Sequence, residues 1–206
     1  MSGTLLVWDI GNVLLEWRPE RYYDRRIGET RRRALFGEVD LDGTNLAIDG
    51  GAAFRDAIHA LAEAHPGWRR EILWWHDDWL ALCAPPIPRS VRLLERCVEK
   101  GVPCHALTNF GADTFAMALE AYPFLRRFDA AHVSAHLRLL KPDPAIYAAV
   151  EARTGLPPEA HLFVDDRAEN VAAAEARGWR AHRFDGPEGW AARLVAEGVL
   201  LADEAG

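Results

Sequence analysis

Residues 4–14 read Thr-Leu-Leu-Val-Trp-Asp-Ile-Gly-Asn-Val-Leu, an apolar run that stops at an acidic residue, Asp9. An apolar run of this length is typical of a strand buried on both faces. Later in the chain, four more apolar runs precede polar residues, and we expect each of them to be a strand as well. They are residues 103–107 before Thr108 and Asn109, 130–133 before Ser134, 160–164 before Asp165 and Asp166, and a weaker run at 180–184.

Segments of helical period lie between these runs, at residues 90–100, 144–154 and 168–177. A glycine follows each segment, at Gly101, Gly155 and Gly178, where a helix commonly ends in a left-handed residue. Strands that alternate with helices of about three turns indicate βαβ units. The sequence therefore predicts an α/β fold with a Rossmann-like, doubly wound parallel sheet.

The interval from residue 16 to residue 85 breaks this alternation. It shows only helical pattern, rich in Trp and Arg, and it ends at Pro85-Pro86-Ile87-Pro88, which is typical of a stiff linker. We interpret residues 16–85 as an all-helical domain inserted after the first strand. The α/β core then consists of residues 1–15 and 86–206.

Charge and composition exclude several classes of partner. The chain of 206 residues carries a formal net charge of −7, which argues against a nucleic-acid partner because such partners bind basic surfaces. We interpret the one basic cluster, residues 31–33, as a solvated helix face. No apolar run approaches the roughly 20 residues that cross a bilayer, so we expect no membrane partner.

The N-terminus and the cysteines bear on the compartment. The first apolar run meets the charged Asp9 too early for a signal peptide. Cys83, Cys97 and Cys104 are odd in number and lack the spacing of a metal site, which suits buried free thiols in a reducing compartment. We predict a cytoplasmic protein.

The polar residues at the strand ends are expected to lie close together in the fold. Open parallel sheets bind ligands beyond the carboxyl ends of their strands, so side chains that follow several strands should meet in one crevice. Lys141 precedes a predicted helix and could reach the same place. The residues expected there are Asp9, Thr108, Asn109, Lys141, Asp165 and Asp166.

Three carboxylates in one crevice repel one another unless a cation shares them. Mg²⁺ suits this set, because it prefers oxygen ligands and combines a few carboxylates with water and substrate phosphate. Lys141 would add positive charge on the side away from the metal. Catalysis of phosphoryl transfer consists mainly of positioning and electrostatics, so the pattern predicts a magnesium-dependent site for a phosphoryl group.

Four motifs resemble those of the haloacid dehalogenase-like hydrolase superfamily, in order and over nearly the whole chain. The form Asp-x-Gly-Asn-Val at Asp9, followed by a helical insertion, is most similar to bacterial sugar-phosphate phosphatases of the glucose-1-phosphate type. The resemblance implies a phosphatase that forms an aspartyl-phosphate and acts on a small phosphorylated metabolite. The motifs are residues 7–14, 106–109, 141–147 and 163–171.

The resemblance also implies roles for the nucleophile and the metal ligands. Asp9 would attack the phosphorus and bind Mg²⁺, and Gly11 would offer its backbone carbonyl to the ion. Asp166 would be the principal acidic ligand, with Asp165 a second ligand or a partner just outside the coordination shell.

For the phosphate, the resemblance implies that Thr108 and neighbouring backbone N–H groups hold its oxygens. Asn109 would lie with them and help to orient Asp9. Lys141 would neutralise both Asp9 and the transferring group. Residues 16–85 would form a cap that selects the leaving group and excludes water.

Gly11 departs from the usual pattern. Many phosphatases of this superfamily carry a second aspartate at that position as general acid and base, and such help is typically worth about 10²–10⁴ in rate. A cap residue or water would have to supply the proton, unless the leaving group departs without one. Anomeric sugar phosphates have comparatively good leaving groups.

Two other functions compete with a phosphatase. A 2-haloacid dehalogenase would use the same Asp9 nucleophile on carbon and would not need an acid at Gly11, but it gains nothing from Asp165 and Asp166. A non-catalytic binding module could also have kept the fold. The sequence leaves open whether the protein is a monomer or a homodimer.

Several predicted cap residues have two readings. We favour packing inside the cap over a binding platform for the aromatic residues at 74–79, and treat His76 as a weak candidate for the proton donor. Residues 45–51 could meet the leaving group or merely start a helix. Trp17 could line the entrance, and Asn170 is more simply explained as structural.

Overall fold

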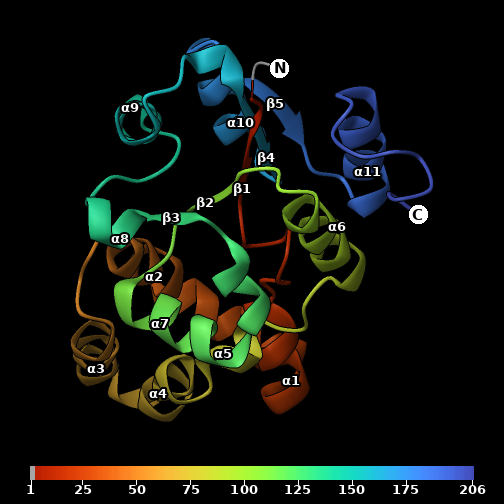
Figure 1. Ribbon diagram of the computed structural model, residues 1–206. Helices are drawn as coiled ribbons and strands as arrows, with labels where there is room; N and C mark the ends of the chain where they lie inside the picture. Colours follow the sequence, from red (N-terminus) through yellow and green to blue (C-terminus); the bar gives the residue numbers. More distant parts are fainter. Residues whose placement is uncertain (1–2) are drawn as a thin grey trace.

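The computed structural model describes residues 3–206, and its centre is a sheet of five parallel strands in the order β3-β2-β1-β4-β5 (Figure 1). The order reverses on either side of β1, as in a doubly wound fold. The strand positions agree with the sequence prediction, except that Thr108 and Asp165 are the last residues of their strands. The strands are β1 (Leu5–Trp8), β2 (Cys104–Thr108), β3 (Ala130–Val133), β4 (His161–Asp165) and β5 (Arg180–Arg183).

β1 lies in the middle of the sheet, which explains its composition. All four of its residues are buried, and it pairs with β2 on one side and β4 on the other. A parallel strand covered on both faces has no solvent side, so its sequence is continuously apolar rather than alternating.

Helices cover both faces of the sheet (Figure 1). Leu6 and Trp8 point to the face covered by α6 (Pro88–Glu99) and α11 (Pro187–Ala196), where Trp8 meets Trp190 edge to face with ring centroids 5.2 Å apart. Leu5 and Val7 point to the face covered by α9 (Pro144–Thr154) and α10 (Ala168–Ala176). The residues of both clusters are buried, and this burial supplies the main driving force for the core.

The expected helix ends are present. The side chain of Asp143 accepts a hydrogen bond from the Ala145 backbone at the start of α9, and Pro144 occupies the first turn. Gly155 ends this helix with a positive φ of 66°, and Gly101 and Gly178 have φ of 72° and 89°. The glycines thus stand where residues with a Cβ would be strained.

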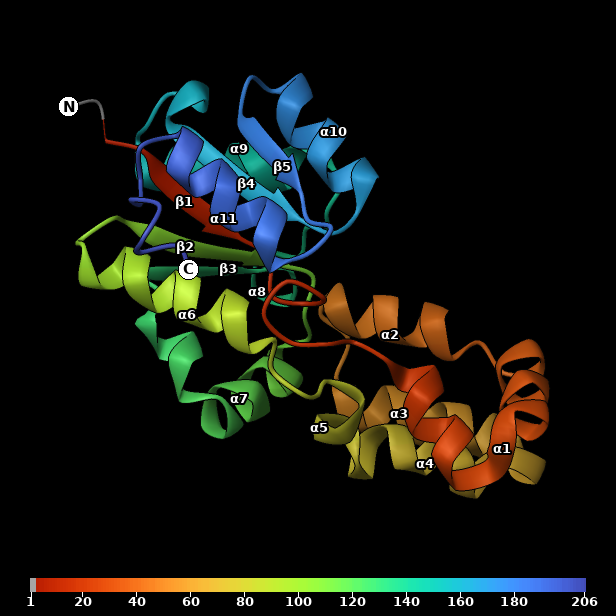
Figure 2. The same cartoon turned by 90° about the vertical axis from the view of Figure 1, so that its right-hand side faces the viewer.

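Between β1 and α6, within the residues that the structure describes, the chain forms five α-helices, one short 3-10 helix (Pro66–Trp68) and no strand. Figure 2 shows these helices grouped beyond the carboxyl end of the sheet, as expected for an inserted helical cap. The remaining core helices are α7 (Ala112–Ala121) and α8 (Ser134–Leu137). The five helices of the insertion are α1 (Pro19–Glu38), α2 (Leu41–Asp49), α3 (Phe54–Ala64), α4 (Arg69–Asp77) and α5 (Trp79–Leu82).

Aromatic side chains form the interior of this helical group. Trp75 is fully buried and packs against Trp17, Tyr23 and Phe36. The Tyr23 hydroxyl donates a hydrogen bond of 2.8 Å to the backbone oxygen of Glu71, so its polar end is satisfied. The expected packing inside the helical group is found for Trp74 and Trp75, whereas Trp79 also lines the cavity described below.

The basic cluster of the sequence is paired with carboxylates. Arg31 lies 2.7 Å from Glu71, and Arg33 lies 2.5 Å from Glu29. All three cysteines are buried and free, and burial raises the pKa of each thiol. In residues 3–206, every helix is too short or too polar to span a membrane.

Candidate active site

The parallel strands deliver polar side chains to one edge of the sheet. Asp9 follows β1, Thr108 ends β2, and Asp165 ends β4, with Asp166 directly after it. Asp9, Thr108 and Asp165 are 7%, 1% and 0% exposed, so the site is sunk into the protein. The sequence prediction that these residues meet is confirmed by their positions.

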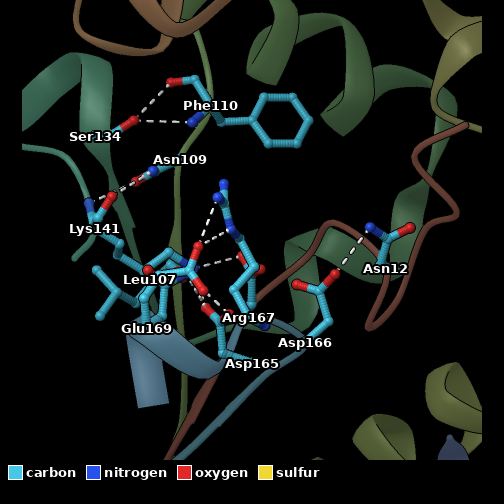
Figure 3. A network of polar contacts seen from close by, with 12 residues as sticks. Asn12, Leu107, Asn109, Phe110, Ser134, Lys141, Asp165, Asp166, Arg167 and Glu169 are labelled. Carbon is cyan, nitrogen blue, oxygen red and sulfur yellow. Dashed lines mark hydrogen bonds and ion pairs between the residues drawn. The ribbon is translucent and has the colours of Figure 1, made fainter. Parts of the chain in front are cut away.

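Lys141 lies at the centre of this group. Its Nζ is 2.8 Å from Oδ1 of Asp9 and 2.6 Å from Oδ2 of Asp165, and it donates a third bond of 2.9 Å to the backbone oxygen of Leu107. Figure 3 shows Lys141 reaching toward the end of β4. An ammonium with these three partners, in a residue that is 4% exposed, is fixed in place.

Asp165 is the most enclosed of the carboxylates. Besides Lys141, it accepts hydrogen bonds from the Asn170 side chain at 2.9 and 3.0 Å and from the Arg167 backbone at 2.9 Å. Both of its oxygens are therefore engaged by the protein. Asn170 supports the site by holding this carboxylate, which agrees with the structural reading of that residue.

Asp166 is held by a residue to which sequence reasoning gave no role. The Asn12 side chain donates a hydrogen bond of 3.0 Å to Oδ2 of Asp166 (Figure 3). Asn12 has φ of 55°, a left-handed conformation that Asn tolerates better than most residues. The signal in the sequence was an Asn directly after Gly11 in a turn.

Asn109 differs from its expected contact. Its side-chain amide donates a bond of 3.0 Å to the backbone oxygen of Lys141, and its side-chain oxygen accepts a bond of 2.8 Å from the Lys141 backbone N–H. These paired bonds orient the segment that carries Lys141. In the described structure Asn109 thus acts on Lys141, whereas the resemblance implied that it would help to orient Asp9.

Burial and mutual charge shape the protonation of the site. Burial raises the pKa of Asp9 to about 7, with Asp165 and Asp166 adding to the rise and Lys141 opposing it. Burial also raises the pKa of Asp166, against the hydrogen bond from Asn12. Burial lowers the pKa of Lys141, but the charges of Asp165 and Asp9 raise it by more than that. The net effect is a raised pKa, so the ammonium stays charged. The carboxylates lie close enough to repel one another, and nearby positive charge reduces this repulsion.

The carboxylate set fits a divalent cation. One oxygen each from Asp9, Asp165 and Asp166 lies within 4.8 Å of the other two. Hard oxygen donors in a pocket with a single ammonium suit Mg²⁺, which needs few protein ligands. Because Asp165 already accepts four bonds, Asp9 and Asp166 have the freer oxygens.

These residues open into a cavity of about 620 Å³. We call the core side of this cavity the floor, and the side formed by the inserted helices the helical wall. Trp17 lines the cavity as expected, but His76 does not and instead contacts Asp77. Floor residues are Asp9, Thr108, Asn109, Lys141 and Asp166, with Asp165 buried beneath them, and wall residues are Asp42, Asn45, Leu46, Asp49 and Trp79.

The helical wall is docked closely on the core through α2. The Ser134 hydroxyl donates a bond of 2.6 Å to the backbone oxygen of Asp49 and accepts one of 2.9 Å from the Phe110 backbone. A Cβ at Gly111 would lie 2.6 Å from Cγ2 of Ile48, so only glycine permits this approach. Residues 45–49 end α2 rather than start a helix, and Asn45, Leu46 and Asp49 line the cavity.

Comparison with known proteins agrees with this geometry. A family model described as haloacid dehalogenase-like hydrolase matches residues 3–178. A sesquiterpene phosphatase of Aspergillus oryzae is 33% identical over 96 residues, which are 47% of this chain and 49% of that protein. The chain therefore spans about half the length of this curated relative.

Solved structures share the fold at low identity. A family enzyme from Bacteroides thetaiotaomicron superposes with a TM-score of 0.75 at 22% identity, covering 93% of this chain and 98% of its own. The same enzyme in complex with magnesium and inorganic phosphate gives a TM-score of 0.67 at 21% identity, covering 87% and 93%. An L-2-haloacid dehalogenase from Xanthobacter autotrophicus gives 0.60 at 19% identity, covering 98% and 86%.

Proposed function

This chain belongs to the haloacid dehalogenase-like hydrolase family, and we propose that it is a magnesium-dependent phosphatase of small phosphate monoesters. The reaction proceeds through an aspartyl-phosphate on Asp9. One observation carries the proposal. Lys141 bridges Asp9 and Asp165, at 2.8 and 2.6 Å, on the same floor as a carboxylate trio that suits a divalent ion.

Asp9 and Asp166 would hold Mg²⁺, and the backbone carbonyl of Gly11, which lines the same cavity, would be a further oxygen donor. The bound ion supplies positive charge that offsets the repulsion between the carboxylates and the phosphate dianion. Of the three carboxylates, Asp165 would be the least available as a ligand, because its oxygens already bond to Lys141, Asn170 and the Arg167 backbone.

The side chains of the floor divide the remaining work. Asp9 attacks the phosphorus with one carboxylate oxygen while Lys141 neutralises the charge that gathers on the transferring group. Thr108 offers a hydroxyl for a phosphate oxygen. Asp165 and Asn109 keep Lys141 aimed, since one binds its ammonium and the other its backbone. Such preorganisation is the main source of catalysis for this reaction class.

Residues 16–85 act as a cap domain that selects the leaving group. The cavity has aromatic surface from Trp17, Trp79 and Phe110, and polar groups from Asp42 and Asn45. A sugar phosphate suits this mixture, because one face of a sugar ring is apolar and its hydroxyls form hydrogen bonds. The name of the Aspergillus relative makes isoprenyl phosphates a second group to include in a screen.

The dehalogenase and the binding module are weaker candidates. A site for halide release from an organic acid gains nothing from Asp165 and Asp166, which add negative charge beside Asp9. A binding module would have no need for the three-way contact of Lys141. We further propose that the protein acts in the cytoplasm, as a monomer or a homodimer.

The test is phosphate release from p-nitrophenyl phosphate and a panel of sugar and isoprenyl phosphates, with magnesium and with EDTA. We expect hydrolysis that needs the metal, and an Asp9→Asn variant with its fold intact by circular dichroism and its activity lost by several orders of magnitude. Half of the activity surviving in Asp9→Asn would show that the chemistry lies elsewhere. Metal-independent chloride release from 2-chloropropionate would support the dehalogenase instead.

A further inference from the structure

Position 11 lacks the general acid that many phosphatases of this superfamily carry two residues after the nucleophile. Gly11 offers no side chain, and a Cβ at that position would have no heavy atom within 4 Å. The space beside the nucleophile on this side is therefore open, and nothing from the first motif can protonate a leaving group. A phosphate ester with an alcohol leaving group needs a proton on that oxygen as the bond to phosphorus breaks.

The helical wall carries one carboxyl group that is suited to this task. Asp49 is the last residue of α2, lines the same cavity as Asp9 and is half-buried. Burial raises the pKa of Asp49 to about 7, Asp9 raises it further, and the Gly111 backbone N–H and Lys141 lower it. An acid near its midpoint at neutral pH can give and take a proton.

The position of Asp49 is fixed from two sides. Its backbone oxygen accepts the bond from Ser134 on the core, and its side chain accepts a bond of 3.0 Å from the Asn45 amide. Asp49 lines the same cavity as Asp9 and Lys141, and the charges of both act on its pKa, so a leaving group bound in this cavity can contact α2. The other charged groups lining the cavity are Asp42, Asp166 and Arg167.

We propose that Asp49, a residue of the cap, is the general acid and base of the reaction. This rests on the proposed phosphatase function. Asp9 forms a bond to phosphorus as the phosphorus–oxygen bond to the leaving group breaks, and the Asp49 carboxylic acid gives its proton to that oxygen. The Asp49 carboxylate then takes a proton from water as the water oxygen attacks phosphorus, which releases inorganic phosphate, frees Asp9 and restores the Asp49 acid.

The test compares leaving groups in wild type and Asp49→Asn. For an alkyl phosphate we expect the variant to be about 10²–10⁴-fold slower, because the alcohol departs poorly without a proton. With p-nitrophenyl phosphate, whose phenolate leaves without help, we expect a rapid burst of p-nitrophenol followed by slow turnover, because only the return of Asp49 as base is lost. The quantity to compare is the ratio of the first-turnover rates of leaving-group release on the two substrates. Measured in one sample, this ratio does not depend on how much of the protein is folded.

Two controls and a pH profile complete the experiment. Asp56→Asn removes an exposed carboxylate of α3 outside the cavity and should leave the ratio unchanged. Asp49→Glu should recover part of the rate on the alkyl phosphate. With that substrate, the decline of wild-type kcat above pH 7, where the raised pKa of Asp49 removes the acid form, should be absent from Asp49→Asn.

If Asp49→Asn slowed leaving-group release in the first turnover equally for both substrates, or left the rate on the alkyl phosphate unchanged, the assignment of Asp49 would be overturned. Neither result would affect the proposed function as long as Asp9→Asn still abolishes hydrolysis. Activity that survives in Asp9→Asn would remove the phosphatase mechanism itself, and the role of Asp49 with it.

Discussion

The floor and the helical wall of the cavity are built on different physical terms. On the floor, Lys141 forms ion pairs with Asp9 and Asp165 and a hydrogen bond to Leu107, Asp165 accepts four hydrogen bonds, and both charged side chains are almost completely buried. On the wall, Leu46 is 51% exposed and Asp42 is exposed. The floor has one arrangement enforced by charge, whereas the wall depends on how α2 is packed against the core.

The difference teaches which part can vary without loss of the chemistry. A buried group of charges tolerates little change, because removing one partner leaves the others uncompensated. A wall of helices held by packing can change its exposed side chains while its backbone stays docked. This agrees with our proposal that the floor carries the reaction and that the wall sets the leaving-group preference.

The largest effect on stability and activity is expected from Lys141→Met, a change in the floor. Lys100→Met is its matched control. Lys100 is the other lysine of the chain and pairs with Glu204 at the surface. In metal-free buffer we expect Lys141→Met to lower the free energy of unfolding by about 3–5 kcal/mol, because Asp9 and Asp165 lose their shared cation. Activity should fall by at least two orders of magnitude.

Lys100→Met should cost at most about 1 kcal/mol, as is usual for an exposed ion pair. Urea denaturation and phosphate release measure the two effects. A Lys141→Met protein as stable as the Lys100→Met protein would show that the floor is not held together by charge.

A smaller effect is expected where the helical wall meets the core. Gly111→Ala forces Ile48 away from the core, and overpacking of this kind costs about 1–3 kcal/mol. Because α2 carries Asp49, the shift should also lower activity, by about tenfold. Gly67→Ala is the control, since a Cβ at that exposed position meets nothing within 4 Å.

Thermal melting and steady-state kinetics report both quantities for this pair. If Gly111→Ala kept the activity and stability of Gly67→Ala, the close approach of α2 to the core would have no functional weight.

The smallest effect concerns the sheet beneath the floor. Burial lowers the pKa of His132 to about 4, helped by nearby His105, so the folded state resists protonation. The unfolded chain takes up that proton near the ordinary value of 6.5, and stability is therefore lost as pH falls from about 6.5 toward 4. Between pH 7 and pH 5 we expect a loss of about 1–2 kcal/mol from this histidine.

His132→Leu should remove that part of the pH dependence, as measured by urea denaturation at the two pH values. The variant separates acid unfolding of the sheet from titration of the cavity residues. An unchanged pH slope in His132→Leu would assign the acid sensitivity to other groups.

The strand ends were predictable from sequence because a buried parallel strand leaves a plain apolar run. Asp9, Thr108 and Asp165 stand at the ends of such runs, and parallel geometry requires them to share an edge. The turn residue Asn12 and the support from Asn170 were harder to predict, because hydrogen bonds between side chains far apart in sequence leave no periodic pattern. For the same reason, the sequence did not reveal that Asn109 bonds to the backbone of Lys141 rather than orienting Asp9.

The sequence by itself determined which carboxylates, which lysine and which hydroxyl lie at the floor. It also determined that a helical segment interrupts the core. These follow from apolar period and from motif spacing, which are local properties. Only the tertiary structure decided that Asp49 lines the cavity and that Gly111 and Ser134 hold it there. Helix packing sets that wall, and packing depends on contacts between residues that the sequence keeps far apart.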